Sequence, residues 1–346
     1  MNLAHKQKIR YHEPRAGGLF CGKWLSSSNY SNSSNSSIVP AKVYTNADTQ
    51  ILNPYFVTGF ADGESTFGVY FRKGAGRKFG YSVSPSFSIG LHSKDRLLIE
   101  RVQSFFEGVG IISEPCPDVI HYTVSSREDL AIIIRHFDKY PLVTQKLADY
   151  LLFKQAFELI SRKEHLTEEG FTQLVAIRAT INRGLSDTFK AAFPGIIPVE
   201  KPVIKDQQVP DPWWLAGFGS AEGSLGIEIY KSSTKTGFNV ALSVRIYQHY
   251  RDEELLKSLR TYLGCGRVTT TTRGDRWFVV AKFTDIETIV IPFFDKYSIE
   301  GVKALDYADF KKAVEIVKAK THLTKEGLEI IRKLKAGMNK GRTDWA

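Results

Sequence analysis

An internal repeat constrains the fold of this chain more than any other feature of its sequence. The block FDKYPLVTQK begins at Phe137, and FDKYSIEGVK begins 157 positions later, at Phe294. The same offset relates HLTEEG at 165 to HLTKEG at 322, and INRG at 181 to MNKG at 338. Two tandem copies are too few for a solenoid. The repeat instead predicts two copies of one domain, arranged as a pseudo-twofold dimer within one chain with a site on its axis.

Composition divides the chain into four expected parts. Residues 1–50 include SSSNYSNSSNSS, a tract that cannot bury enough apolar surface to fold, so we expect a disordered Ser/Asn-rich leader there. A basic, acid-poor start of this kind can also be a transit peptide. We expect the first copy over 51–187, a Pro-containing linker over 188–210 and the second copy over 211–346.

Charge and cysteine content narrow the class of protein. The 346 residues carry 47 Lys plus Arg against 37 Asp plus Glu, which favours an anionic partner, most often nucleic acid. The three cysteines, Cys21, Cys116 and Cys265, have neither CxxC nor zinc-ligand spacing. Since no run of 18 apolar residues occurs, we predict no membrane span.

Hydrophobic periodicity predicts the same α+β fold in both copies. A short apolar helix is followed by segments that alternate with period two, such as TFGVYFR and YSVSPSFSIGLH, which indicates a half-buried antiparallel hairpin. A helix follows in each copy, with Asp95 and Asp252 at the two starts as candidate caps. A second strand pair and two helices complete an α-β-β-α-β-β-α-α unit with one sheet.

The apolar helix of each copy carries small residues on one face. They are Gly59 and Gly63 in VTGFADGES, and Gly217 and Ala221 in LAGFGSAEG. Residues four apart share a helix face, and small residues at that spacing let two helix backbones approach closely. We therefore expect the two helices to pack against each other; the alternative is that each helix packs only on its own sheet.

Each of these motifs ends in a carboxylate, Glu64 in the first copy and Glu222 in the second. Two carboxylates at adjacent helix C-termini repel each other and the helix dipoles. Divalent cations would relieve this repulsion, and Mg²⁺ is commonly bound by one or two carboxylates together with substrate phosphates. Paired metal sites of this kind support phosphodiester hydrolysis, and two pseudo-symmetric sites could cut two antiparallel strands.

In these motifs, and in the FDKY, HLTEEG and MNKGR blocks, the chain resembles the intron-encoded LAGLIDADG homing endonucleases of the monomeric two-repeat type. The resemblance runs from about Asn53 to Arg342. It implies two αββαββα repeats whose antiparallel sheets form a DNA-binding saddle around a two-helix interface. It also implies a site-specific double-strand DNA endonuclease that uses Mg²⁺ or Mn²⁺, recognises a long asymmetric site and leaves short 3′ overhangs.

The resemblance assigns the metal ligands by motif position. The acidic residues that bind the catalytic metals would be Glu64 and Glu222. The backbone carbonyls of Gly63 and Ala221 would assist them. The ninth motif position is usually Gly, which relieves backbone strain past a helix end, but the first copy has Ser65 there.

The resemblance also implies further catalytic residues. A basic residue near each metal site matches Lys146 and Lys303, which end the repeated FDKY blocks. The alternative for each lysine is a solvated position at the start of a helix. Gln248 matches a polar strand-end position that orders water in relatives, and its counterpart is Leu91, so the two half-sites are expected to differ chemically.

The polar face of the strands is the surface we expect to contact DNA, because a β-ribbon fits the major groove. Any single residue there could instead be merely solvated. By alternation the face comprises Gly68, Tyr70, Arg72, Ser82, Ser84, Ser86, Ser88, Gly226, Glu228, Tyr230, Asn239, Ser243, Arg245, Tyr247 and Lys282. The basic loops RKGAGRK and KSSTKTG would reach phosphates at the ends of the site.

Two alternative functions fit the same fold. One is a group I intron RNA-splicing maturase, and the other is a catalytically decayed DNA-binding protein. The retained glutamates favour an active endonuclease, because an RNA chaperone does not need them, although they allow a bifunctional protein. The family usually occurs in organellar introns, chiefly of fungi, which implies a mitochondrial setting.

Overall fold

The computed structural model of the protein describes residues 51–342. The leader expected over 1–50 lies outside this range. Within it, two units of the same element order follow one another along the chain, so the predicted α+β fold with two tandem repeats is confirmed. No helix in the described range is long and apolar enough to cross a membrane.

In the first repeat, three helices follow the second strand pair where two were predicted, so the repeat contains five helices and four strands. They are α1 (Pro54–Glu64), β1 (Ser65–Lys73), β2 (Tyr81–His92), α2 (Arg96–Phe105), β3 (Ile111–Cys116), β4 (Val119–Val124), α3 (Arg127–Lys139), α4 (Lys146–Ser161) and α5 (Glu168–Thr180). The elements of the second repeat are α7 (Pro212–Glu222), β5 (Gly223–Lys231), β6 (Phe238–Gln248), α8 (Glu253–Leu263), β7 (Arg267–Thr270), β8 (Arg276–Val280), α9 (Phe283–Asp285), the π-helical turn η4 (Ile286–Val290), α10 (Ile291–Lys296), α11 (Lys303–Lys318) and α12 (Lys325–Ala336).

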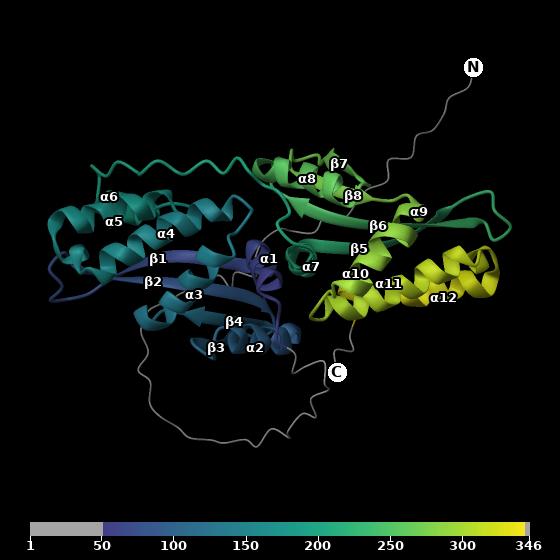
Figure 1. Cartoon of the computed structure of the whole chain (residues 1–346), viewed down its shortest axis with the longest axis horizontal. Helices are drawn as coiled ribbons and strands as arrows, with labels where there is room; N and C mark the ends of the chain where they lie inside the picture. Colours follow the sequence, from purple (N-terminus) through teal and green to yellow (C-terminus); the bar gives the residue numbers. More distant parts are fainter. Residues whose placement is uncertain (1–50, 343–346) are drawn as a thin grey trace, which may run out of the picture.

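Each repeat has one antiparallel sheet, with strand order β1-β2-β4-β3 in the first and β5-β6-β8-β7 in the second. The registers match, since Ser65 pairs with Ile89 in one sheet and Gly223 with Ile246 in the other. The sheets lie at the left and right of Figure 1, with α1 and α7 between them.

One face of each sheet is buried under helices and the other carries polar side chains. In the first repeat, the fully buried Phe67 of β1 packs against Phe137 of α3 and Phe153 of α4, with ring centroids 5.4 Å from each. Tyr70 and Arg72, on the opposite face of the same strand, are exposed. The period-two pattern therefore identified the core face correctly.

Helices α1 and α7 pack with their backbones in contact at the two motif glycines. A Cβ added at Gly59 would lie 2.0 Å from the carbonyl oxygen of Trp214, and one added at Gly217 would lie 2.0 Å from that of Phe56. This reciprocal contact confirms the predicted two-helix interface. The small residues are required because any side chain at these positions would push the helices apart.

The predicted caps of α2 and α8 are wrong. Asp95 and Asp252 make no capping hydrogen bond to the helices that they precede. In each case a one-turn 3₁₀ helix ends at the aspartate, and the Nδ1 atoms of His92 and His249 cap these turns instead. Because the chain has already turned there, both carboxylates are directed away from their own helices, towards the other repeat.

The predicted linker contains a short helix that the sequence analysis did not anticipate, α6 (Asp187–Ala192). The ring of Phe189 lies 5.1 Å from that of Phe71 of β1, and Phe193 lies 5.6 Å from Tyr81 of β2. Further along, Lys201 pairs with Asp149 of α4 at 2.6 Å. Much of the segment between the repeats is therefore packed on the first repeat.

The strain expected at Ser65 is not found. Its φ is −84°, and φ of Gly223, its counterpart, is −70°, so both residues have extended backbones that any residue adopts. The Ser65 hydroxyl donates a hydrogen bond of 2.7 Å to the carbonyl of Ala61. Serine is therefore accommodated at the end of α1 without a special backbone conformation.

Candidate active site

Glu64 and Glu222 end the two central helices, and the helix ends touch where these residues lie. A Cβ added at Gly63 would lie 2.3 Å from the Cβ of Ala221 and 3.2 Å from the Cγ of Glu222. The small residues that precede the carboxylates thus let the carboxylates approach each other across the pseudo-twofold axis. The structure brings together the two acids that the sequence analysis selected.

The electrostatic environment of the two acids is unfavourable for their charged forms. Burial, and then the neighbouring charge of Glu64, raise the pKa of Glu222 to about 7 against the opposing effects of Lys146 and Lys303. Burial also raises the pKa of Glu64. A protein that retains two such carboxylates side by side holds a site that favours bound cations.

Replacement of Glu222 by Gln is expected to stabilise the metal-free protein near pH 8 by about 2 kcal/mol, because it removes a carboxylate whose ionisation is disfavoured in the fold. A raised folded-state pKa stabilises the fold at low pH, and that contribution is lost as the pH rises through about 7. The gain from Glu222→Gln should therefore shrink towards zero near pH 5.

Urea denaturation in EDTA at the two pH values measures this difference. Glu158→Gln, at an exposed position on α4, serves as the matched control and should change the free energy of unfolding little at either pH. An equal effect of Glu222→Gln at both pH values would show that its carboxylate is not perturbed in the fold.

Two lysines bind the C-terminal carbonyls of the central helices. Lys146 begins α4, and its Nζ donates to the carbonyls of Ala61 and Gly63 at 2.9 and 3.0 Å. Lys303 begins α11, and its Nζ donates to the carbonyl of Ala221 at 2.9 Å. Burial lowers the pKa of both lysines, and the two glutamates oppose that shift. Both lysines thus lie in the site rather than in solvent.

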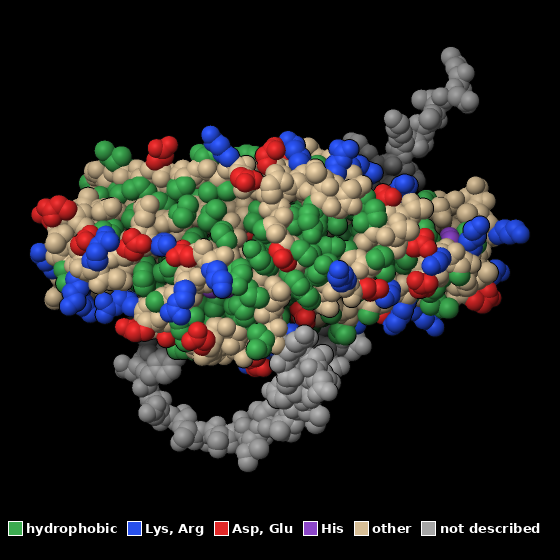
Figure 2. All heavy atoms as spheres, in the orientation of Figure 1, with side chains coloured by type: hydrophobic (Ala, Val, Ile, Leu, Met, Phe, Trp, Pro, Cys, Tyr) green, Lys and Arg blue, Asp and Glu red, His purple; other side chains and the backbone are tan. Residues whose placement is uncertain are grey.

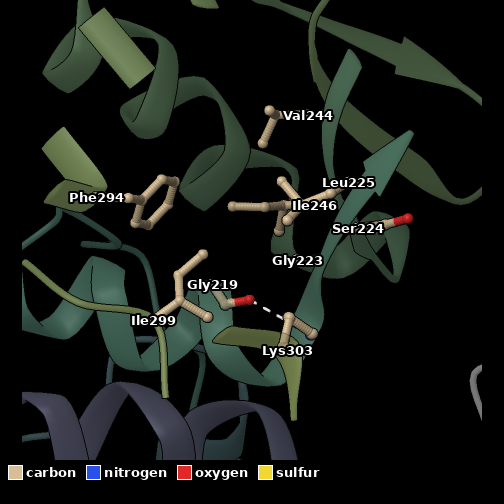
Figure 3. Close-up of a pocket in the computed structure, with 9 residues that line it drawn as sticks. All are labelled: Gly219, Gly223, Ser224, Leu225, Val244, Ile246, Phe294, Ile299 and Lys303. Atoms are coloured by element: carbon tan, nitrogen blue, oxygen red, sulfur yellow. Dashed lines mark hydrogen bonds between the residues drawn. The ribbon is translucent and has the colours of Figure 1, made fainter. Parts of the chain in front are cut away.

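The side chain of Lys303 borders an apolar pocket. Figure 3 shows its side chain pointing to the carbonyl of Gly219, 3.4 Å from Nζ, beside a pocket with apolar walls. The side chains that line this pocket include Leu225, Val244, Ile246, Phe294 and Ile299. Apolar walls of this kind confine the aliphatic part of the lysine and leave the ammonium group directed at the helix end.

Gln248 ends β6 and forms a side-chain hydrogen bond with Glu222, which opposes the rise in the pKa of that acid. Its counterpart at the end of the first hairpin is Leu91, which has no polar atom to offer Glu64. The two half-sites therefore differ chemically.

The sequence analysis missed the role of Asp62, which is buried between the central helices. Its Oδ1 accepts hydrogen bonds from the backbone N–H and the hydroxyl of Thr144 at 3.0 and 2.6 Å. Its Oδ2 accepts from the N–H of Val143 and from Nε1 of Trp214 at 2.9 and 2.8 Å. Asp62 thus joins α1 and α7 to the segment that leads into Lys146. The sequence offered one indication of this role: Asp62 occupies a motif position at which the second copy has Ser220, so the two copies differ there.

The donor atoms of the site suit a hard divalent cation. Within residues 51–342, no group of three or more His, Cys, Asp or Glu side chains could hold a metal. An ion here would depend on the carboxylates of Glu64 and Glu222, the carbonyls of Gly63 and Ala221, and oxygens of a substrate. Each carbonyl has a second lone pair beside the one that a lysine uses. An all-oxygen donor set of this kind fits Mg²⁺, Mn²⁺ or Ca²⁺.

All but one of the residues predicted to face DNA lie on the polar face of the sheets, but three of these are covered. The ring of Tyr70 lies over Gly68, since a Cβ there would meet ring atoms at 2.7 and 2.8 Å. Ser86 and Ser243 are only 9% and 4% exposed, so they do not offer accessible side chains. By contrast, Tyr70 and Tyr230 are 44% and 45% exposed. Alternation identified the correct face of the sheet, but it did not indicate how exposed each side chain on that face is.

Several polar residues of this face contact one another. In the second repeat, Arg245 forms an ion pair with Glu228, and Nδ2 of Asn239 donates to the hydroxyl of Tyr230 at 2.9 Å. The hydroxyl of Tyr247 donates to Asp275. In the first repeat, Arg72 is exposed and the side chains of Ser82, Ser84 and Ser88 are partly exposed. On the face of the second sheet these side chains are therefore paired with one another, whereas the buried hydroxyl of Ser243 has no hydrogen-bond partner within residues 51–342.

The prediction that Lys282 lies on the polar face of a strand is wrong. The strand β8 ends at Val280, and Lys282 lies beyond it at the start of α9, where it pairs with Asp285 at 3.2 Å. Strand alternation therefore does not apply to this residue. The β1–β2 and β5–β6 turns lie at the two ends of the long axis in Figure 1, where Figure 2 shows Lys and Arg side chains together with Asp and Glu, and the contact of the hairpin tips with phosphates stays a prediction.

The motif sequences, the repeated fold and the paired carboxylates define one class of protein. The chain belongs to the LAGLIDADG endonuclease family, which matches it at residues 57–157 and 215–314, more than half of its length. Each matched segment contains most of one motif helix, the strand pair that follows it and one of the two lysines that bind the helix ends.

Individual relatives agree with this assignment. "Probable intron-encoded endonuclease 3" of Neurospora crassa is 38% identical over 307 residues, which cover 86% of this chain and 58% of that protein. The chain thus spans less than two thirds of that relative. The crystal structure of the I-SmaMI LAGLIDADG homing endonuclease bound to cleaved DNA is 46% identical, with a TM-score of 0.83 over 84% of this chain and 98% of that one. I-SmaMI bound to an uncleaved DNA target in the presence of calcium ions is 45% identical, with a TM-score of 0.82 over 84% of this chain and 100% of that one.

Proposed function

We propose that this protein is a site-specific homing endonuclease that hydrolyses both strands of a long asymmetric DNA site and leaves short 3′ overhangs. The observation that carries the proposal is the pair of glutamates at the touching ends of α1 and α7, each end bound by a lysine. The similarity to I-SmaMI, whose complexes contain DNA, supports it. The protein acts as a monomer, because its two repeats supply both half-sites.

In this proposal the site residues act as follows. Glu64, Glu222 and the carbonyls of Gly63 and Ala221 hold divalent cations, for which we propose Mg²⁺, with Mn²⁺ as a substitute. When bound, such cations supply an activated water and stabilise the leaving oxygen of the phosphodiester. Lys146 and Lys303 stabilise the negative charge that develops on the phosphate during cleavage. Gln248 orients a water at one of the two half-sites.

The uncovered faces of the two sheets are the proposed DNA-binding saddle. Tyr70, Tyr230 and Arg72 are exposed there and can contact base edges, and the Glu228–Arg245 pair would have to exchange its partners on binding. The basic tips of the hairpins would bind phosphates, so affinity should fall steeply as salt concentration rises.

The proposed cellular setting is a mitochondrial intron. Support comes from the family, which usually occurs in organellar introns, and from the relative of Neurospora crassa that is named as intron-encoded. A role as an intron RNA maturase, alone or beside cleavage, is the alternative. The unstrained backbone at Ser65 argues against a decayed enzyme, because it removes the structural reason to expect lost activity.

Incubation of the purified protein with a randomised duplex DNA library tests the proposal. In Mg²⁺ we expect sequenced ends that share one long, nearly unique site with short 3′ overhangs, and in Ca²⁺ we expect retention of the same site without cleavage. Retention without cleavage in both ions would identify a decayed enzyme. The absence of any selection from DNA would favour the maturase.

A further inference from the structure

The segment that leads into Lys303 is held by a carboxylate of the opposite repeat. Asp95, at the start of α2, accepts a hydrogen bond of 2.7 Å from the backbone N–H of Val302, the residue directly before Lys303. The contact is close, because a Cβ added at Gly301 would lie 2.6 Å from Oδ1 of Asp95. Gly301 has φ of +72°, a conformation that L side chains rarely adopt. A glycine at this position therefore allows both the turn and the close approach of the Asp95 carboxylate.

A second side chain of α2 contacts the same segment. Arg101, six residues after Asp95, pairs with Glu300 at 2.6 Å, and the two side chains are 15% and 25% exposed. The backbone N–H of Glu300 also donates to the hydroxyl of Ser220 in α7 at 3.0 Å. The segment 299–302 is therefore bound on two sides, by the first repeat and by its own motif helix.

An equivalent contact joins the second repeat to the segment that leads into Lys146 of the first repeat. Asp252, at the start of α8 and 2% exposed, accepts a hydrogen bond of 2.7 Å from the backbone N–H of Gln145, directly before Lys146. Its Oδ1 also accepts from Nε2 of Gln207 at 2.7 Å, and Gln207 donates to the carbonyl of Val143 at 3.2 Å. A residue between the repeats thus takes the place that Arg101 has on the first side.

The position of these contacts along the acceptor helices matters. Val302 and Gln145 are the N-cap residues of α11 and α4, and neither caps its helix with its own side chain; in α4 the hydroxyl of Thr144 accepts the N–H of Lys146 at 3.2 Å. A carboxylate at a helix N-terminus satisfies a free N–H and interacts favourably with the helix dipole. An ordinary cap comes from a neighbouring residue of the same segment, whereas these carboxylates come from 207 and 107 residues away.

We propose that Asp95 and Asp252 are positioning residues for DNA cleavage, each holding the first turn of the lysine-bearing helix of the opposite repeat. This inference rests on the proposed endonuclease function. Each lysine is then correctly placed only when the other repeat is docked against it. Since Lys303 and Lys146 bind different helix ends, loss of one aspartate should impair the cleavage of one DNA strand more than that of the other.

The experiment follows the nicking and linearisation of a supercoiled plasmid that carries the target site, with each strand labelled. For Asp95→Ala we expect at least about tenfold slower cleavage of one strand, with unchanged target affinity in Ca²⁺, because small misplacements of a catalytic group are costly. For Asp252→Ala we expect slower cleavage of the opposite strand. Asp95→Asn and Asp252→Asn keep an oxygen that can accept the N–H, so they should restore much of the rate.

Val102→Ala and Leu259→Ala are matched controls. Both residues are completely buried in α2 and α8, at equivalent positions of the two repeats, and belong to the hydrophobic cores of the first and the second repeat. They should lower stability while slowing both strands in proportion. If an alanine variant of either aspartate does not fold, the serine variant, whose shorter side chain holds its oxygen farther from the N–H, should show the same strand-selective slowing and provides the test.

Equal slowing of both strands by Asp95→Ala, or an unchanged strand ratio in both aspartate variants, would overturn the inference while the wild type still cleaves. Absence of cleavage by the wild type on its selected site would overturn the proposed function, and the inference with it. The two failures are therefore distinguished by the wild-type reaction in the same experiment.

Discussion

Substitution of Glu64 by Gln is expected to lower the rate of double-strand cleavage by about 10³-fold or more, because it removes a carboxylate that we propose as a metal ligand at the centre of the site. The change keeps the size of the side chain and removes one of two mutually repelling charges, so the fold should be retained. Target binding in Ca²⁺ should stay within about tenfold, since the strands and hairpin tips form the proposed DNA-binding surface.

Cleavage rates in Mg²⁺ and gel-shift titrations in Ca²⁺ measure the two quantities separately. Glu329→Gln, on the exposed surface of α12, is the matched control and should leave both unchanged. Cleavage of both strands by Glu64→Gln at the wild-type rate would show that the carboxylate pair is not the active site. Intron splicing, if the protein supports it, should be unaffected by the substitution.

The second large effect is expected at the helix contact. Gly59→Ala would place a Cβ 2.0 Å from the carbonyl oxygen of Trp214, which is more than 1 Å inside a normal contact distance, so α1 and α7 must separate. Since Trp214 is fully buried and donates to Asp62, separation disturbs both cores. We expect a loss of at least about 3 kcal/mol in the free energy of unfolding, at the upper end for an overpacked core.

Gly219→Ala is the control within α7. Its Cβ would meet only the ring of Phe294, at 3.3 Å, which can shift, so its cost should stay within about 1 kcal/mol. Chemical denaturation of both variants compares them directly. A similar small cost for Gly59→Ala would mean that the helices are not held together by close backbone contact. Folded Gly59→Ala protein should also cleave slowly, because Glu64 moves with its helix.

Elements with a strong local pattern were predictable from the sequence. The motif helices, the strand pairs and the helices after them follow from period-two and helical spacing. Because the chain repeats, each of these elements could be predicted from two stretches of sequence. The carboxylates recur at nearly one offset in the two motifs, whereas the lysines were assigned through the resemblance to the family and supported by the repeated FDKY blocks. These signals lie within a few residues of the features that they predict.

Features that depend on distant partners could not be predicted. Asp95 has the same local sequence signals whether it caps its own helix or binds a backbone N–H 207 residues away. Asp62 likewise gains its four hydrogen bonds only after α1, α7 and the segment before Lys146 have come together. Alternation indicates which face Ser243 occupies, but not that neighbouring groups cover it. Lys282 was misplaced because the sequence does not mark the end of β8.

The backbone contact between α1 and α7 has an evolutionary consequence. The separation of Glu64 from Glu222 depends on main-chain atoms and four small residues, whereas the side chains that would recognise bases lie on strands outside this contact. Mutations on those strands can therefore accumulate without altering the spacing between the two cuts. In the proposed enzyme, descendants could acquire new target sequences while every one of them still produced the same overhang.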